Sequence, residues 1–148
     1  MIFREAQTAD IKQLHSVRMS VNENVLPDPT LLTVKEYDEF LSVKGKGWVC
    51  EIKDSIVGFG IVDLEKFNIW ALFIKPEHEG KGIGKKLQNI MLTWYFSRTK
   101  HRIWLGTSPN TRAEVFYRNQ GWKEVGKQPN GEIRLELNFE DWKKKYFT

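Results

Sequence analysis

One segment in the middle of the chain constrains the fold more than any other: a strand pattern, a glycine loop and a helical pattern in immediate succession. The run Ile69–Ile74 is apolar without alternation, which is typical of a central strand covered on both faces. A proline ends the run, and glycines follow at every second position, Gly80, Gly82 and Gly84. Apolar residues then recur at helical spacing, so a helix is expected over residues 84–96 with its lysines outward. The segment therefore predicts an α/β fold in which the loop joins a buried strand to a helix.

The remaining sequence alternates between helix and strand patterns, with no internal repeat and no low-complexity linker. Its length suits one domain with a sizeable core, so we expect a single domain over residues 1–148. The predicted fold class is α/β (α+β), with a mixed central sheet flanked by helices. Besides the segment above, helices are expected at residues 11–18, 33–41 and 111–119, and strands at residues 2–4, 48–53, 56–63, 103–105, 122–125 and 133–137.

The charge balance excludes few functions. The 23 basic and 19 acidic residues give a net charge of +4, a mild excess that suits an anionic ligand without requiring nucleic acid. No stretch approaches the roughly 20 apolar residues of a membrane span, and the first residues lack the apolar core of a signal peptide. We therefore expect a cytoplasmic protein that binds neither membrane nor nucleic acid.

Cysteine and histidine usage argues against a metal site or a covalent intermediate. Cys50 is the only cysteine, so no intramolecular disulfide can form, and its apolar neighbours favour a core thiol over a nucleophile. His15, His78 and His101 are scattered without metal-ligand spacing, which favours surface histidines. We expect no bound metal.

The glycine loop suggests a phosphate site, because bare backbone lets N–H groups approach an anion at the start of a helix. Two nucleotide motifs fail on spacing. A Walker A loop would need glycine where Glu79 stands and Ser or Thr where Lys86 stands. The dinucleotide fingerprint would need its third glycine at Lys85. The phosphate therefore belongs to another class of ligand.

The loop spacing does resemble the signature Arg/Gln-x-x-Gly-x-Gly/Ala of the GNAT superfamily, the acyl-CoA-dependent N-acyltransferases. A second block supports the resemblance after the next predicted strand, and the two blocks together cover about residues 56 to 126. The resemblance implies a GNAT-like fold with a splayed central strand pair, and acetyl-CoA as co-substrate. The second block consists of Asn110, Ala113, Phe116, Tyr117 and Gly121-Trp122.

The resemblance also implies roles for individual residues. Tyr117 would protonate the leaving thiolate as general acid, and a phenol with a pKa near ~10 suits that role while it stays protonated. Asn110 would hydrogen-bond the cofactor arm. The main chain of Leu72, Phe73 and Ile74 would bind the pantetheine arm and the acyl carbonyl, and the pyrophosphate would lie on Glu79, Gly80, Lys81, Gly82, Ile83 and Gly84.

Two positions depart from the family pattern. Glu79 stands where the family usually has Arg or Gln, so its effect on cofactor binding is open. The positions where many members carry a catalytic Glu hold Asn68 and Leu105, which leaves the general base open. Simpler alternatives also stand for the other two polar residues: Tyr117 as an ordinary core aromatic, and Asn110 as a helix cap.

The sequence thus predicts an N-acetyltransferase that moves an acetyl group from acetyl-CoA directly to a primary amine of a small molecule or peptide. A non-catalytic acyl-CoA sensor on the same fold is the alternative, and a nucleic-acid-binding domain, suggested by Lys143–Lys145, is a distant third. The protein would act as a monomer or homodimer. We expect the loop at residues 19–32 to line the acceptor site, where Glu23 and Asp28 suggest a cationic acceptor.

Overall fold

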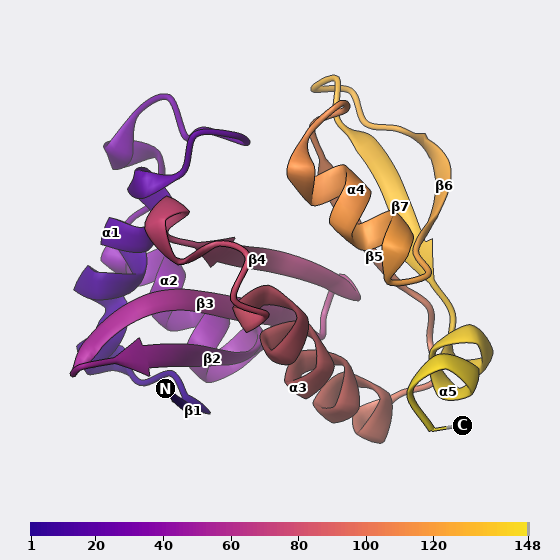
Figure 1. Cartoon of the computed structure of the whole chain (residues 1–148), viewed down its shortest axis with the longest axis horizontal. Helices are drawn as coiled ribbons and strands as arrows, with labels where there is room; N and C mark the ends of the chain where they lie inside the picture. The colour runs from indigo at the N-terminus through magenta and orange to yellow at the C-terminus, as the bar shows by residue number, and fades with distance from the viewer. Residues whose placement is uncertain (148) are drawn as a thin grey trace.

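The computed structural model describes residues 1–147, which form one seven-stranded sheet in the order β1-β2-β3-β4-β5-β7-β6, with helices on its faces (Figure 1). The strands are β1 (Ile2–Glu5), β2 (Gly45–Ile52), β3 (Ser55–Asp63), β4 (Asn68–Ile74), β5 (Ile103–Thr107), β6 (Lys123–Lys127) and β7 (Ile133–Leu137). The helices are α1 (Ile11–Ser20), α2 (Val34–Glu39), α3 (Ile83–Arg98), α4 (Arg112–Asn119) and α5 (Phe139–Phe147), with short 3₁₀ turns at Thr8–Asp10, Pro29–Leu31 and Pro76–His78.

The sheet is mixed, as predicted. Neighbouring strands are antiparallel except β4 and β5, which run parallel. Within residues 1–147, β4 and β5 pair at one position, Asn68 with Trp104, and then separate. Figure 1 shows the two parts diverging, with β1–β4 on one side and β5, β7 and β6 on the other. The expected splayed central pair is confirmed.

The helices bury different faces of the sheet. On one face, α1 and α2 pack Leu14 and Tyr37 against Phe59 and neighbouring residues of the sheet. On the other face lies α3, whose expected amphipathic pattern is confirmed by exposed lysines and a buried Met91. Gly60 of β3 allows this close approach, because a Cβ there would collide with the sulfur of Met91.

Val57 and Phe59 lie two positions apart in β3 but on opposite faces, because a register shift between Cys50 and Glu51 turns Val57 to the α3 face. The side chains of Lys143–Lys145 are exposed, and these lysines belong to α5, which inserts Trp142 into the core at 4% exposure. The expected core position of Cys50 is confirmed, since the side chain is fully buried.

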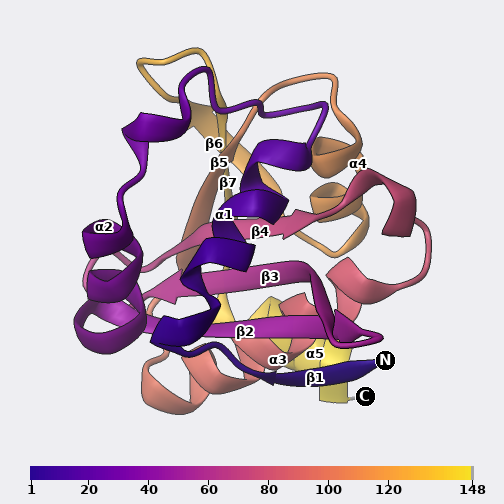
Figure 2. The ribbon, with the colours of Figure 1, turned by 90° about the vertical axis from the view of Figure 1, so that its left-hand side faces the viewer.

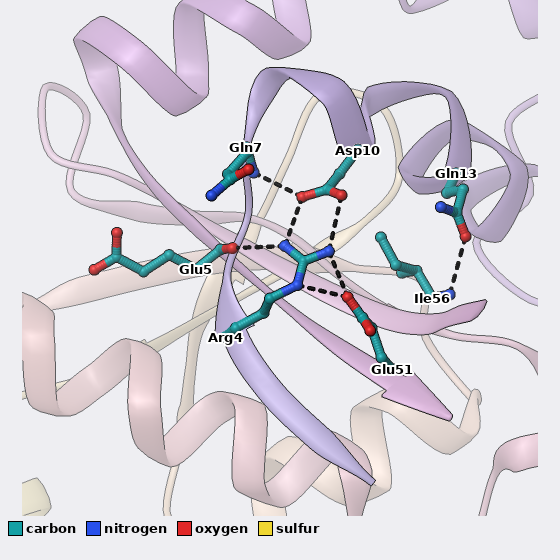
Figure 3. A network of polar contacts seen from close by, with 7 residues as sticks. All are labelled: Arg4, Glu5, Gln7, Asp10, Gln13, Glu51 and Ile56. Atoms are coloured by element: carbon teal, nitrogen blue, oxygen red, sulfur yellow. Dashed lines mark hydrogen bonds and ion pairs between the residues drawn. The ribbon is translucent and has the colours of Figure 1, made fainter. Parts of the chain in front are cut away.

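The start of α1 is fixed by a polar cluster around Arg4 (Figure 3). The guanidinium of Arg4 donates from Nη1 and Nη2 to the two carboxylate oxygens of Asp10 at 2.8 and 2.9 Å, and from Nε to Glu51 of β2. Asp10 also accepts from the backbone N–H of Gln7 at 2.8 Å. Gln13 then accepts from the N–H of Ile56, which ties the first turn of α1 to β3. These contacts fix α1 against the sheet and so determine the position of its C-terminal end.

The helices in the described range, residues 1–147, include none that is both long and apolar enough to cross a membrane.

Candidate active site

The opening between β4 and β5 holds a pocket of about 460 Å³, called here the first pocket. Beyond Asn68, the edge of β4 that faces away from β3 has no neighbouring strand within residues 1–147, so its backbone groups there are available to a ligand. The structure brings together most of the residues predicted to bind the cofactor. Leu72, Phe73, Ile74, Glu79, Gly80, Gly82, Ile83 and Gly84 all line this pocket.

The glycine loop forms the end of the first pocket at the start of α3. Gly80 and Gly82 have φ of 76° and 80°, a left-handed conformation that other residues adopt at a cost. A Cβ at either position would meet no atom within 4 Å, so the loop faces open space. Gly82 is the N-cap of α3, and the first intrahelical bond runs from the N–H of Lys86 to its carbonyl at 3.1 Å. The preceding N–H groups lack helical partners and face an anion site.

Charged side chains surround this loop in an arrangement that the sequence did not reveal. Glu79 forms an ion pair with Arg112, the first residue of α4, at 2.5 Å. The pair joins the glycine loop to the opposite wall of the first pocket, since both residues line it. Lys81 does not line the pocket; its Nζ lies 3.0 Å from Nδ1 of His78.

Tyr117 occupies the boundary between two pockets. It lies on α4, is 6% exposed, and contacts the rings of Phe116 and Trp122 edge-on at centroid distances of 5.2 and 5.6 Å. Its hydroxyl forms no hydrogen bond with any group in residues 1–147. Burial raises the pKa of the phenol well above its ordinary value, because the charged form is disfavoured away from water. The group is therefore a protonated donor at neutral pH.

The second pocket, about 650 Å³, adjoins the first along β4 and α4. Tyr117 belongs to the buried core cluster and also lines both pockets, so ligands in the two pockets would meet beside it. The residues common to both linings are Asn24, Leu72, Phe73, Ala113 and Tyr117.

The segment between α1 and α2 lies across the opening, next to the β5–α4 connection (Figure 2). Asn24 accepts from the N–H of Ser108 at 2.8 Å and donates to Thr107 Oγ1 at 3.3 Å. Glu23 accepts from the N–H of Arg112 at 2.9 Å. These bonds join the two parts of the sheet and place the segment along both pockets, as expected for residues 19–32.

The hint of a cationic acceptor finds no support in these contacts. The carboxylate of Glu23 is used by the backbone of α4, and Asp28 caps the turn at Pro29–Leu31 by accepting from Thr30 at 2.9 Å. Neither Asp28 nor any other aspartate lines the second pocket within the described residues.

The structure places Asn110 away from both pockets. Its side chain is exposed, its φ is 62°, and its N–H donates to Glu114 at 2.7 Å. The helix cap expected as an alternative is instead Thr111, whose hydroxyl accepts from the N–H of Glu114. The suggested contact of Asn110 with the cofactor arm stays a prediction without a geometric counterpart here.

Sequence reasoning missed two charged residues of the second pocket, Arg18 of α1 and Glu132 of the β6–β7 connection. No local motif marks either one, because they come from distant parts of the chain and the fold brings them to one pocket. Asn68 and Leu105, the positions where the base was missing, also line this pocket, and Oδ1 of Asn68 is buried without a hydrogen-bond partner in the described part of the chain. Glu132 is thus a carboxylate in the place where the sequence indicated none.

No group of three or more His, Cys, Asp or Glu side chains within residues 1–147 is arranged to hold a metal ion.

Comparisons with known proteins agree with this geometry. The model of the acetyltransferase (GNAT) family matches residues 9–122. An uncharacterized N-acetyltransferase of Archaeoglobus fulgidus is 34% identical over 100 residues, which cover 59% of this chain and 67% of the relative. The PaiA N-acetyltransferase from Thermoplasma acidophilum, solved in complex with coenzyme A, is similar in fold with a TM-score of 0.79 at 13% identity, over 93% of this chain and 98% of that one. The ribosomal-protein-alanine N-acetyltransferase from Brucella melitensis has a TM-score of 0.75 at 18% identity, over 94% and 100%.

The chain belongs to the acetyltransferase (GNAT) family, because the family model spans well over half of it. It is an acetyl-CoA-dependent N-acetyltransferase, and acetyl-CoA is its co-substrate. The resemblance seen in the two sequence blocks is confirmed.

Proposed function

We propose that the protein transfers the acetyl group from acetyl-CoA in the first pocket directly to a primary amine of a small molecule or peptide in the second pocket. The observation that carries this proposal is the position of Tyr117, a buried and protonated phenol that lines both pockets where they adjoin. A proton donor at this junction would lie next to the thioester as the acetyl group passes from CoA to the amine.

The first pocket fits coenzyme A on two independent features. The free edge of β4 beside Leu72 and Ile74 can bond an extended arm as a neighbouring strand would. The open glycine loop, with the unpaired N–H groups of the first turn of α3, suits a diphosphate. The thioester that acetyl-CoA supplies is an activated acyl group.

The reaction balances with one proton moved at each end. The amine nitrogen forms a C–N bond to the acetyl carbon, the C–S bond breaks, and its electron pair goes to sulfur. The neutral amine loses one proton to water as the C–N bond forms, and the sulfur gains one, so the products are an N-acetyl amine and the free thiol. Tyr117 donates the proton to sulfur and recovers one from solvent. Burial raises the pKa of the phenol, and it also disfavours the thiolate form of a thiol nearby, so the transfer remains feasible.

Direct transfer is favoured because the chain offers no placed nucleophile for an acyl-enzyme. Cys50 is fully buried in the core, and burial raises the pKa of its thiol. It lines neither the first nor the second pocket.

The test replaces Tyr117 by Phe, which keeps the aromatic ring and removes the hydroxyl group that would donate the proton. We expect kcat to fall about ten- to a thousandfold while CoA affinity, measured by titration calorimetry, stays nearly unchanged. Tyr95→Phe is the matched control, because Tyr95 is fully buried in α3 with its hydroxyl on the carbonyl of Arg102. An unchanged kcat in folded Tyr117→Phe, with chemistry shown to limit turnover, would remove Tyr117 from the reaction.

A further inference from the structure

One strongly charged group beside the site has no assigned partner: the guanidinium of Arg18, near the C-terminal end of α1. It lies over the ring of Phe73, with its central carbon 4.2 Å from the ring centroid, and it lines the second pocket. Its Nη1 is buried and has no hydrogen-bond partner anywhere in residues 1–147. Over the same residues, Arg18 has no carboxylate oxygen within 4.0 Å.

A buried cation without a partner is costly, because the charge has lost water and gained no anion. The half-burial of Arg18 lowers the pKa of its guanidinium, while the charge of Glu132 acts in the opposite direction. The guanidinium nevertheless remains a cation at neutral pH. A bound anion would restore the missing hydrogen bonds, so the arrangement favours a ligand that brings one.

The charges of the second pocket narrow the choice of anion. In the described chain, the charged side chains of its lining are Arg18 and Glu132. The carboxylate of Glu132 lies against β5, where a Cβ on Gly106 would be 2.7 Å from Oε1, and Asn130 donates to that oxygen at 3.0 Å. A phosphate dianion would face one cation and one opposing carboxylate. A single carboxylate matches the single guanidinium, whose planar fork can bind it through two parallel bonds.

Glu132 complements the other end of such a ligand. At neutral pH the amine that accepts the acetyl group is an ammonium ion in solution, and a carboxylate in the same pocket attracts it. It loses one proton to water before it attacks the thioester. The lining of the same pocket also includes the aromatic residues Trp70, Phe73 and Trp104, which suit the carbon skeleton of a small molecule.

We propose that the acceptor is a free amino acid, an amine that also carries a carboxylate, and that Arg18 binds this carboxylate and so determines specificity. The inference rests on the proposed function, since it names the substrate class of the same transfer. It places the anionic end of the acceptor on α1, over Phe73, and the ammonium on the side of Glu132.

The experiment compares matched pairs of acceptors, L-amino acids and their carboxamides, at saturating acetyl-CoA with detection of the free thiol. For the wild type, kcat/KM should favour the acid over its amide by about ten- to a hundredfold in at least one pair, the range of a charge-assisted bond. Arg18→Gln should lose this preference, mainly through a higher KM, and Arg18→Lys should keep part of it. Arg98→Gln is the matched control, because Arg98 also lies over a ring, that of Trp94 at 5.3 Å, outside both pockets.

The outcomes separate this inference from the proposed function. Stabilisation by CoA should be equal in Arg18→Gln and the wild type, which shows that the variant folds and keeps the first pocket. Amides or simple alkylamines acetylated as well as the acids, or an acid preference retained in Arg18→Gln, would overturn the role of Arg18 while the transfer to amines stands. If peptides with a free N-terminus are acetylated and the free amino acids are not, the role of Arg18 is overturned and the transfer to amines stands. If CoA binds and neither acids, amides, alkylamines nor such peptides are acetylated, both proposals are rejected.

Discussion

The ion pair between Glu79 and Arg112 yields a prediction about cofactor affinity. Glu79 lies in the glycine loop that we propose binds the pyrophosphate, and its carboxylate holds the guanidinium of Arg112 across the first pocket. Replacing Glu79 by Gln removes a negative charge from the site and also releases a positive one. Both effects favour an anionic ligand, so Glu79→Gln should bind CoA more tightly.

The magnitude follows from exposure. The side chains of Glu79 and Arg112 are 38% and 68% exposed, so water screens the pair strongly. Exposed ion pairs contribute about 0.2–1 kcal/mol, and charges at a helix start act on a similar scale. CoA affinity should therefore rise about two- to fivefold at low salt, and the gain should shrink as salt shortens the screening length to roughly 8 Å.

The assay is titration calorimetry of CoA with the wild type, Glu79→Gln, Arg112→Gln and the double variant, at two salt concentrations. Arg112→Gln alone should weaken binding by a similar factor, because it leaves the carboxylate of Glu79 without its partner beside the loop. In the Arg112→Gln background, Glu79→Gln should gain less than in the wild type, since no arginine is released. Weaker CoA binding in Glu79→Gln would show that the ion pair holds the loop in its binding conformation, and the electrostatic reasoning would be refuted.

Three further outcomes test the scaffold around the site. The hydrogen bonds from Arg4 hold the pKa of Asp10 below its ordinary 3.8. This pair therefore stabilises the fold above pH 3.8 and loses its contribution as the pH falls through the lowered pKa. Asp10→Asn should lower the free energy of unfolding by about 1–3 kcal/mol at pH 7 in urea titrations, and this free energy should depend less on acid pH than in the wild type. Gln88 accepts from Trp122 Nε1 at 2.8 Å and donates to Tyr146 at 3.0 Å, so Gln88→Leu should cost about 1–3 kcal/mol in the same assay, and no loss would show that water replaces these bonds. Gly60→Val should lower the melting temperature, because Met91 occupies the space of the new side chain, whereas Gly126→Val, with open space around it, should change it little.

The part of the site that could be predicted from sequence is the part made by neighbouring residues. A continuous apolar run, the glycines with positive φ at Gly80 and Gly82, and a helix start are local properties, so the first pocket could be placed before any contact was known. The helix boundary at Ile83 differs from the predicted start by one residue, because the N-cap Gly82 rather than Gly84 begins the turn.

The acceptor side could not be predicted, because long-range packing makes it. Arg18 and Glu132 are 114 positions apart in sequence, and their common pocket depends on α1 lying over β4 and on the β6–β7 connection reaching β5. The turn of Val57 to the other face is of the same kind, since the register of β2 decides it. Likewise, α5 has few apolar residues to mark it as a helix in the sequence, and it is stabilised by the core in which Trp142 is buried.

The early separation of β4 from β5 would make coenzyme A a structural component as well as a reactant under the proposed function. In a continuous sheet, the outer edge of Leu72–Ile74 would be bonded to a neighbouring strand; here the arm of the bound cofactor would supply those bonds. Without it, the two parts of the sheet meet at one strand pairing, at the segment through Asn24, and through the helices beneath. Binding should therefore slow amide exchange along β4 and β5 together, so that the protein is most rigid when it holds its substrate.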